Sequence, residues 1–272
     1  MSLSVIASIY HKETPVYLKA ALESISCQTL TPTLFVLVFD GNIGKALENV
    51  VNTWLDSYPG EVKLIRKEIN QGLAVALNDA LKCCNSEYIA RVDTDDISLP
   101  NRFELQVGFL EKNVDVDVVG SNIAEIDSSN KIINSHVKYP ESHAECLTFF
   151  RKRDPLAHPA TMFRRSYFEK AGFYDESFVG NKNYEDTILW YQGFRNNCKF
   201  ANIQEVLLHF RRTEEFYSRR GGVTKSFNFF KDRLRIVSEL KLGFSGYLFA
   251  FLYFILAISP SSIKKIAYNF LR

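Results

Sequence analysis

Three aspartates within four positions, Asp93, Asp95 and Asp96, are the sharpest chemical feature of this 272-residue sequence. They follow the apolar segment 88–92, and in an extended chain the first two point to the same side. Carboxylates this close repel one another at neutral pH unless a cation neutralises them, and oxygen ligands favour Mg²⁺ or Mn²⁺ over zinc. The cluster therefore predicts a divalent-metal site. The alternative is a solvated acidic turn in which Asp96 or Ser98 caps the next helix.

Two polar segments beside apolar runs could hold a nucleotide. Asp40 follows the run 34–39 and could accept a hydrogen bond from a nucleobase imide or a ribose hydroxyl, or close a tight turn through its own backbone. Asn70 and Gly72 precede an apolar helix and could offer backbone N–H groups to a nucleotide, although Asn70 could equally be a plain helix cap. Because no GxGxxG or GxxxxGKS/T pattern occurs, the usual dinucleotide and P-loop phosphate sites are not predicted.

A second acidic pair, Glu185 and Asp186, precedes the apolar segment 187–190. The pair could cap that helix and interact with its dipole, or one carboxylate could be a general base that removes a proton from an acceptor hydroxyl. His158 stands alone, and a lone histidine is more often structural than catalytic. The arginine pairs at 211–212 and 219–220 indicate a solvated face, unless a diphosphate must be held by their guanidinium groups.

The elements that must position these residues alternate between strand and helix. Apolar runs predict strands over 5–10, 34–39, 62–66 and 88–92, and amphipathic stripes predict helices from Thr14, over 47–58 and 73–81, and from Ser98 to Leu110. This alternation predicts an α/β fold with a parallel sheet, whose ligands bind beyond the carboxyl ends of the strands. After about residue 120 the pattern is looser, with strands near 132–133 and 206–210 and helices over 167–171 and 186–196.

Composition and charge exclude several classes of protein. With 46% hydrophobic and 24% charged residues, the chain is neither disordered nor a disulfide-rich miniprotein. Five cysteines without CxxC spacing and an N-terminus without signal-peptide character predict a cytosolic protein. The net charge of +2 argues against nucleic-acid binding, but it is unevenly distributed. Residues 211–272 carry twelve basic and four acidic side chains, so a basic tail follows an acidic body.

The tail contains 22 uncharged residues, 242–263, which as a helix would be about 33 Å long. Basic residues flank this run on both sides, so they indicate no inside–outside asymmetry. We therefore expect the run to lie in the cytoplasmic leaflet rather than to cross the membrane. The alternative is a C-terminal hairpin packed on the catalytic part. The flanking residues are Arg233, Arg235, Lys241, Lys264, Lys265 and Arg272.

Taken in order, these motifs resemble the inverting GT-A-fold glycosyltransferases of family 2, especially bacterial enzymes that build O-antigen and capsule repeat units. The resemblance covers roughly residues 3 to 220. The motifs that carry it are Ser8-Ile9-Tyr10, Val38-Phe39-Asp40-Gly41, Asn70-Gln71-Gly72-Leu73-Ala74 with Ala76-Leu77-Asn78, Arg91-Val92-Asp93-Thr94-Asp95-Asp96, His158-Pro159-Ala160 with Met162-Phe163-Arg164, and Tyr184-Glu185-Asp186.

The resemblance assigns a role to each candidate residue. It implies that Asp186 is the catalytic base with Glu185 as its neighbour, and that His158 contacts the acceptor. It further implies a metal site and a donor site. The implied metal ligands are Asp93, Asp95 and Asp96, and the implied donor-binding residues are Tyr10, Asp40, Asn70, Gly72, Arg91, Asp93, Arg211 and Arg212.

The resemblance also implies an α/β, GT-A-like fold, with a mainly parallel nucleotide-binding sheet flanked by helices, an acceptor-binding part and an apolar helical tail. Residues 1–120 would bind the nucleotide sugar, 121–241 the acceptor, and 242–272 the membrane. The implied reaction moves a hexose or N-acetylhexosamine from a UDP-sugar, with Mn²⁺ or Mg²⁺, to a sugar on a polyprenyl diphosphate. It would form a β-linkage at the cytoplasmic face of the bacterial inner membrane.

Two other classes of protein remain open at this stage. A nucleotidyltransferase would use a similar metal-bound nucleotide site, but we would expect a glycine-rich signature with a basic residue near the N-terminus, which residues 8–13 lack. A non-catalytic carbohydrate-binding or scaffold protein would not need Asp93, Asp95, Asp96 and Asp186 together.

Overall fold

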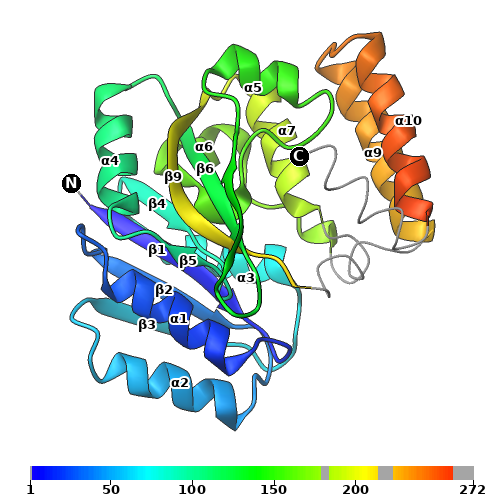
Figure 1. The fold of residues 1–272 in the computed structure, drawn as a ribbon. Helices are drawn as coiled ribbons and strands as arrows, with labels where there is room; N and C mark the ends of the chain where they lie inside the picture. The colour runs from blue at the N-terminus through cyan, green and yellow to red at the C-terminus, as the bar shows by residue number, and fades with distance from the viewer. Residues whose placement is uncertain (1, 179–183, 214–222, 260–272) are drawn as a thin grey trace.

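The computed structural model describes residues 2–178, 184–213 and 223–259. Its centre is one nine-stranded sheet in the order β3-β2-β1-β4-β8-β6-β9-β5, with β7 paired to β6 (Figure 1). The strands are β1 (Leu3–Ile9), β2 (Leu34–Phe39), β3 (Glu61–Arg66), β4 (Tyr88–Arg91), β5 (Ile97–Ser98), β6 (Val118–Ile126), β7 (Ile132–Val137), β8 (Met162–Arg164) and β9 (Phe200–Arg211).

Helices cover the sheet and extend beyond it. They are α1 (Pro15–Ser26), α2 (Lys45–Leu55), α3 (Leu73–Leu81), α4 (Arg102–Lys112), α5 (His143–Phe149), α6 (Arg165–Ala171), α7 (Glu185–Arg195), α9 (Val223–Glu239) and α10 (Phe244–Ile258), with 3-10 turns η1 (His158–Ala160) and η2 (Glu176–Phe178).

The N-terminal part follows the predicted strand–helix alternation. β1 pairs in parallel with β2 and β4, and β2 pairs in parallel with β3. Alternate side chains of β1 pack on opposite faces of the sheet. Val5 belongs to the core covered by α1 and α2, and Ile6 belongs to the core on the other face, against α3. Such burial on both faces explains the continuous apolar runs that predicted these strands.

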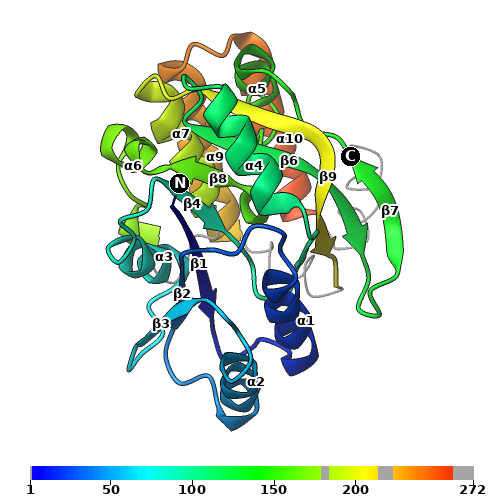
Figure 2. The ribbon, with the colours of Figure 1, turned by 90° about the vertical axis from the view of Figure 1, so that its left-hand side faces the viewer.

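The strands β1 to β4 form the expected parallel part of the sheet, and the C-terminal part adds antiparallel strands and makes the whole sheet mixed. β8 runs antiparallel between β4 and β6, and β9 pairs in parallel with β6. β7 lies at the outer edge of this part (Figure 2). The boundary expected after residue 120 falls inside β6, so one sheet continues from the first part into the second.

Two predicted element boundaries are wrong. Ser98 does not start a helix: it lies in β5, which pairs with β9, and α4 begins only at Arg102, beyond Pro100. The second helix ends at Leu55 rather than at residue 58, although Tyr58 still packs beneath it by stacking on Trp54 with ring centroids 4.3 Å apart.

Helices α9 and α10 lie side by side at the C-terminal end of the described chain (Figure 1). α9 packs on the core through Ile236 and Val237, and Gly246 of α10 lies so close that an added Cβ would come within 2.9 Å of Val237. α10 buries Ala250 but leaves most of its large apolar side chains exposed. Within the described ranges, no helix has both the length and the apolar character that crossing a membrane requires.

Candidate active site

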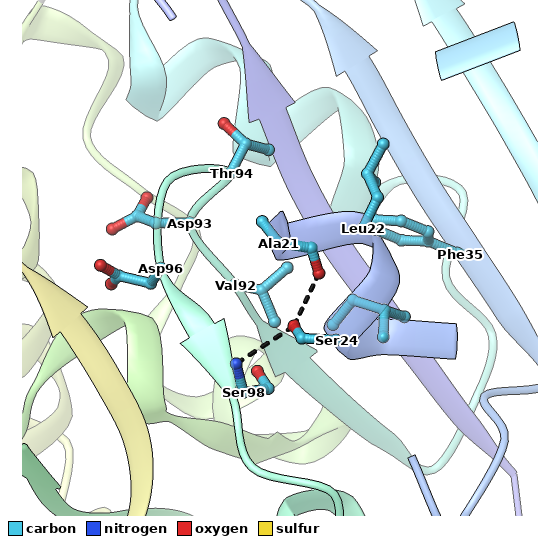
Figure 3. A pocket seen from close by; sticks show the side chains of 10 residues that line it. Ala21, Leu22, Ser24, Phe35, Val92, Asp93, Thr94, Asp96 and Ser98 are labelled. Atoms are coloured by element: carbon cyan, nitrogen blue, oxygen red, sulfur yellow. Dashed lines mark hydrogen bonds between the residues drawn. The ribbon is translucent and has the colours of Figure 1, made fainter. Parts of the chain in front are cut away.

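The three aspartates of the acidic cluster converge at the end of β4. One carboxylate oxygen from each of Asp93, Asp95 and Asp96 lies within 4.8 Å of the others. The side chains of Asp93 and Asp96 lie on the same side of their loop, away from α1 (Figure 3). The loop is fixed to α1 by Ser24, whose Oγ donates to Ala21 O (2.6 Å) and accepts from Ser98 N (3.1 Å) (Figure 3).

Asp96 is the least solvated carboxylate of the cluster, with 2% exposure. Its Oδ1 accepts from the backbone N–H of Arg211 at 2.7 Å, whereas its Oδ2 has no hydrogen-bond partner among the described residues. Burial and the charges of Asp95 and Asp93 raise the pKa of Asp96 well above its ordinary value. An all-oxygen donor set with an unpartnered buried oxygen fits a hard divalent cation such as Mg²⁺ or Mn²⁺.

Arg91 fixes the orientation of Asp93 within the acidic cluster. Its guanidinium group is buried and pairs with both carboxylate oxygens of Asp93, at 2.7 and 2.6 Å. The buried Arg102 supports it by donating from Nη2 to the Arg91 carbonyl at 2.8 Å. A bidentate pair of this kind fixes the plane of the carboxylate. The structure thus places Arg91 against Asp93; its predicted contact with the donor stays a prediction.

Asp40 brings together the two segments that were expected to hold a nucleotide. Its two carboxylate oxygens accept from the backbone N–H groups of Gln71 and Gly72, both at 2.8 Å, and its carbonyl accepts from Asn70 Nδ2 at 3.1 Å. Gly41, at φ +87°, makes this possible, because an added Cβ would lie 2.7 Å from the Asn70 nitrogen. Asp40 therefore joins the end of β2 to the start of α3, and Asn70 bonds to it rather than capping α3.

Glu185 and Asp186 lie in the first turn of α7, one residue earlier than the predicted start of the helix, and Tyr184 rather than either acid occupies the N-cap. Asp186 Oδ1 accepts from the backbone N–H of Thr187 at 2.8 Å. Burial and the charge of Asp186 raise the pKa of Glu185 to about 7, and the charges of Arg91 and Asp93 also act on it. The charge of Asp93 therefore acts on Glu185 although the two residues are about 90 positions apart in sequence.

Asp154 is a site residue that the sequence did not reveal. It lies in the loop between α5 and η1, and both its carboxylate oxygens accept from Thr187 Oγ1, at 2.9 and 3.0 Å. Burial and the charge of Asp186 raise the pKa of Asp154 to about 7. The residue is a single aspartate before a proline, which has no motif character, so only the fold shows that it neighbours Asp186.

His158 lies beneath the site with 6% of its surface exposed. Its Nε2 is 2.7 Å from the Tyr174 hydroxyl, and its ring packs edge-on to Trp190 at 5.7 Å. Burial and the charge of Arg91 lower its pKa well below the ordinary value, so the ring is neutral at pH 7. The structure gives His158 a position in the core, and its contact with an acceptor stays a prediction.

Arg211 and Arg212 lie at the end of β9, beside the acidic cluster. Arg211 donates from its side chain to the carbonyls of Asp95 (2.7 Å) and Asp127 (2.9 Å), and its Nη2 has no hydrogen-bond partner in the described part of the chain. Arg212 pairs with the buried Glu125 at 2.8 Å. Tyr10 follows β1 directly, at the same edge of the sheet as Asp40. Arg219 and Arg220 lie outside the described residues.

Helix α9 contacts the segment that carries the acidic pair. Tyr184, which precedes Glu185, donates from its hydroxyl to Asp232 at 2.8 Å and packs edge-on to Phe229 at 4.8 Å. Arg233 is buried and donates to the carbonyl of Arg151 at 3.0 Å. Arg233 therefore belongs to the core and is not available to a membrane surface, which corrects its expected role as a flanking charge.

Comparisons with known proteins show the family of the chain. The sequence model of the family described as "Glycosyl transferase family 2" matches residues 4–172. An Escherichia coli UDP-Gal:alpha-D-GlcNAc-diphosphoundecaprenol beta-1,3-galactosyltransferase is 32% identical over 244 residues, covering 90% of this chain and 82% of the relative. The amylovoran biosynthesis glycosyltransferase AmsE of Erwinia amylovora is 32% identical over 271 residues, covering 98% and 97%.

The fold is also found in a solved structure. Residues 1–349 of Staphylococcus aureus TarS, crystallised with UDP-GlcNAc, superpose with a TM-score of 0.63 at 17% identity, covering 97% of this chain and 83% of that one. This likeness confirms the expected α/β, GT-A-like fold, and the relatives exclude the nucleotidyltransferase and scaffold alternatives. The chain belongs to glycosyltransferase family 2 and is a glycosyltransferase.

Proposed function

We propose that this enzyme transfers a hexose or N-acetylhexosamine from a UDP-sugar to a sugar on a polyprenyl diphosphate, with inversion to a β-linkage, in surface polysaccharide synthesis. The observation that carries the proposal is the convergence of Asp93, Asp95 and Asp96 at the end of β4 in a family 2 glycosyltransferase, with Glu185 within reach of the charges of Arg91 and Asp93. The E. coli relative is named for transfer from UDP-Gal to a GlcNAc-diphospholipid, and TarS was crystallised with UDP-GlcNAc, which supports both substrate classes.

In this proposal, Asp93, Asp95 and Asp96 hold Mn²⁺ or Mg²⁺, which would supply positive charge against the leaving diphosphate. Arg91 keeps the Asp93 carboxylate in a fixed plane, so the ligand oxygens are preorganised. Asp40 shapes the nucleoside site by holding the backbone of Gln71 and Gly72, and its carboxylate can still accept from a uracil imide because each oxygen has two lone pairs.

Asp186 acts as the general base in this mechanism. It takes the proton from the acceptor hydroxyl while that oxygen bonds to the anomeric carbon, and the bond from that carbon to the UDP oxygen breaks. One displacement from the opposite face inverts the anomeric configuration, so an α-linked donor gives a β-linked product. Residues 1–120 then serve the donor and 121–241 the acceptor and the base.

The proposed location is the cytoplasmic face of the inner membrane, with α10 and the rest of 242–272 as the attachment. α10 exposes a row of large apolar side chains, and Arg235 and Lys241 are exposed nearby. Helices that lie on anionic lipid insert apolar side chains into the bilayer surface and carry basic residues on their flanks. The exposed apolar side chains of α10 are Phe244, Tyr247, Leu248, Phe249, Phe251, Leu252, Tyr253, Ile255 and Ile258.

The test is UDP release from a panel of UDP-sugars with a synthetic sugar-diphospholipid acceptor, in Mn²⁺, in Mg²⁺ and in EDTA. We expect acceptor-dependent release with one UDP-sugar, loss of release in EDTA, and a β-linkage in the product by NMR. If none of the UDP-sugars supported release of UDP, the donor assignment would be wrong. If release were undiminished in EDTA, the metal assignment would be wrong.

A further inference from the structure

A buried link joins the proposed base, Asp186, to Asp154, which lies 32 residues earlier in the chain. Thr187, which is 2% exposed, makes two separate hydrogen bonds. Its backbone N–H donates to Asp186 Oδ1 at 2.8 Å, and its hydroxyl donates to the Asp154 carboxylate at 2.9 and 3.0 Å. Because threonine is stiff about χ1, the second bond also restrains the backbone that makes the first.

We propose that Asp154 and Thr187 are positioning residues that hold the carboxylate of Asp186 in its reactive orientation. The inference rests on the proposed role of Asp186 as the base. Tyr184, at the N-cap of α7, makes no side-chain capping bond. The hydroxyl of Thr187 therefore anchors the first turn of α7 to the loop that carries Asp154, which is the kind of support a catalytic carboxylate needs from its neighbours.

Asp154 also acts on Asp186 through its charge, in addition to the hydrogen bond from Thr187. Asp186 faces it from α7, Arg233 faces it from α9, and Arg153 precedes it on its own loop. Asp154 is neutral below about pH 7, and only its ionisation above that pH places a second negative charge beside Asp186, a repulsion that Arg233 limits. Asp154 thus affects both the orientation and the basicity of Asp186.

Four variants separate these effects. Thr187→Val removes the hydroxyl at constant shape, and Thr187→Ser retains it. Asp154→Asn keeps an oxygen that can accept from Thr187 but removes the charge. Asp115→Asn is the matched control, because Asp115 is an exposed aspartate on another loop. For each variant, kcat and KM for the UDP-sugar and the acceptor are measured from pH 5 to 9, with Asp186→Asn assayed alongside.

We expect Thr187→Val to lower kcat between about 10- and 100-fold, the usual cost of a catalytic group displaced by ~1 Å, while KM for the UDP-sugar changes less than about two-fold. Thr187→Ser should restore most of the loss. Asp154→Asn should leave the kcat profile below about pH 6 unchanged, because Asp154 is protonated there, and should remove the change in kcat near pH 7 that its ionisation beside the base causes. Asp115→Asn should match the wild type.

Wild-type kcat and pH profiles for Thr187→Val and Asp154→Asn, together with an inactive Asp186→Asn, would overturn the positioning role and leave the base assignment standing. An active Asp186→Asn would overturn the base assignment itself, and with it this inference. If Thr187→Val does not fold, the pH profile of Asp154→Asn decides: a change in kcat near pH 7 that persists in this variant refutes the inference, and its loss supports it.

Discussion

Replacing Asp154 by asparagine should stabilise the enzyme at alkaline pH. The raised pKa of about 7, compared with the ordinary 3.8, means that the folded chain holds a proton between these values that the unfolded chain has lost. The free energy of unfolding therefore falls as pH rises from about 4 to 7 through the titration of Asp154. Above pH 7 the full destabilisation by its buried charge is present. Asparagine has no such cost because it does not ionise.

The size of the effect follows from the same numbers. Each pH unit between the two pKa values costs about 1.4 kcal/mol. From pH 5 to pH 8 the advantage of Asp154→Asn should therefore grow by up to about 3 kcal/mol. The charge of Arg233 lowers the pKa of Asp154 and is already contained in the value of about 7, so no separate loss is subtracted. We expect a growth of roughly 2 to 3 kcal/mol.

The assay is urea unfolding of the wild type, Asp154→Asn and Asp115→Asn at pH 5, 6.5 and 8. The measured quantity is the change with pH in the difference between variant and wild type, so any constant loss from the altered Thr187 bond cancels. A difference for Asp154→Asn that stays constant from pH 5 to 8, or one that shrinks, would show that Asp154 ionises normally and would refute the reasoning.

Three further outcomes are expected. In EDTA, Asp95→Ala should unfold at a higher temperature than the wild type, because the repulsion among the three carboxylates is relieved. In Mn²⁺ the variant should lose both the rise in Tm and the activity that the metal gives the wild type. An unchanged Mn²⁺ response would remove Asp95 from the metal site. Asp186→Asn should lower turnover about 10²-fold or more while calorimetry shows intact UDP-sugar binding, whereas lost binding with normal turnover would make it a binding residue. Leu248→Glu, Phe251→Glu and Ile255→Glu combined should release the enzyme from anionic vesicles in flotation assays, and the wild type should stay bound in high salt; retention of the triple variant would mean that α10 does not face lipid.

The sequence predicted the N-terminal half of the fold because its signals are local there. β2 (Leu34–Phe39) is a continuous apolar run between two helical layers, and its predicted bounds are those observed. β6 (Val118–Ile126) was missed, although it is buried along its whole length, because it carries Asn122 and Glu125. Asn122 accepts from Tyr139 N at 2.8 Å and Glu125 pairs with Arg212, partners that only the fold reveals.

The same distinction applies to the site. The residues of the acidic cluster are neighbours in sequence, so their spacing alone predicted a shared site, and the structure brings them within 4.8 Å. Asp154 is 32 positions from Asp186 and belongs to no motif, so its part in the site depends on the packing of the α5–η1 loop against α7. The sequence predicts a helix start at Ser98 where the structure has a strand, because β5 has only two residues, too few for any periodicity.

The bond between Tyr184 and Asp232 has a consequence for which acceptors can be extended. α9 is attached to the residue preceding the acidic pair, and α10 lies against α9. If α10 rests on the bilayer, two packed helices rather than a loose linker set the height of Asp186 above the lipid headgroups. A sugar chain anchored by its diphosphate reaches that height only at a particular number of residues. The fixed height of the helix pair would then select acceptors by length. The enzyme would add one sugar at one stage of repeat-unit assembly and leave longer products to the next enzyme.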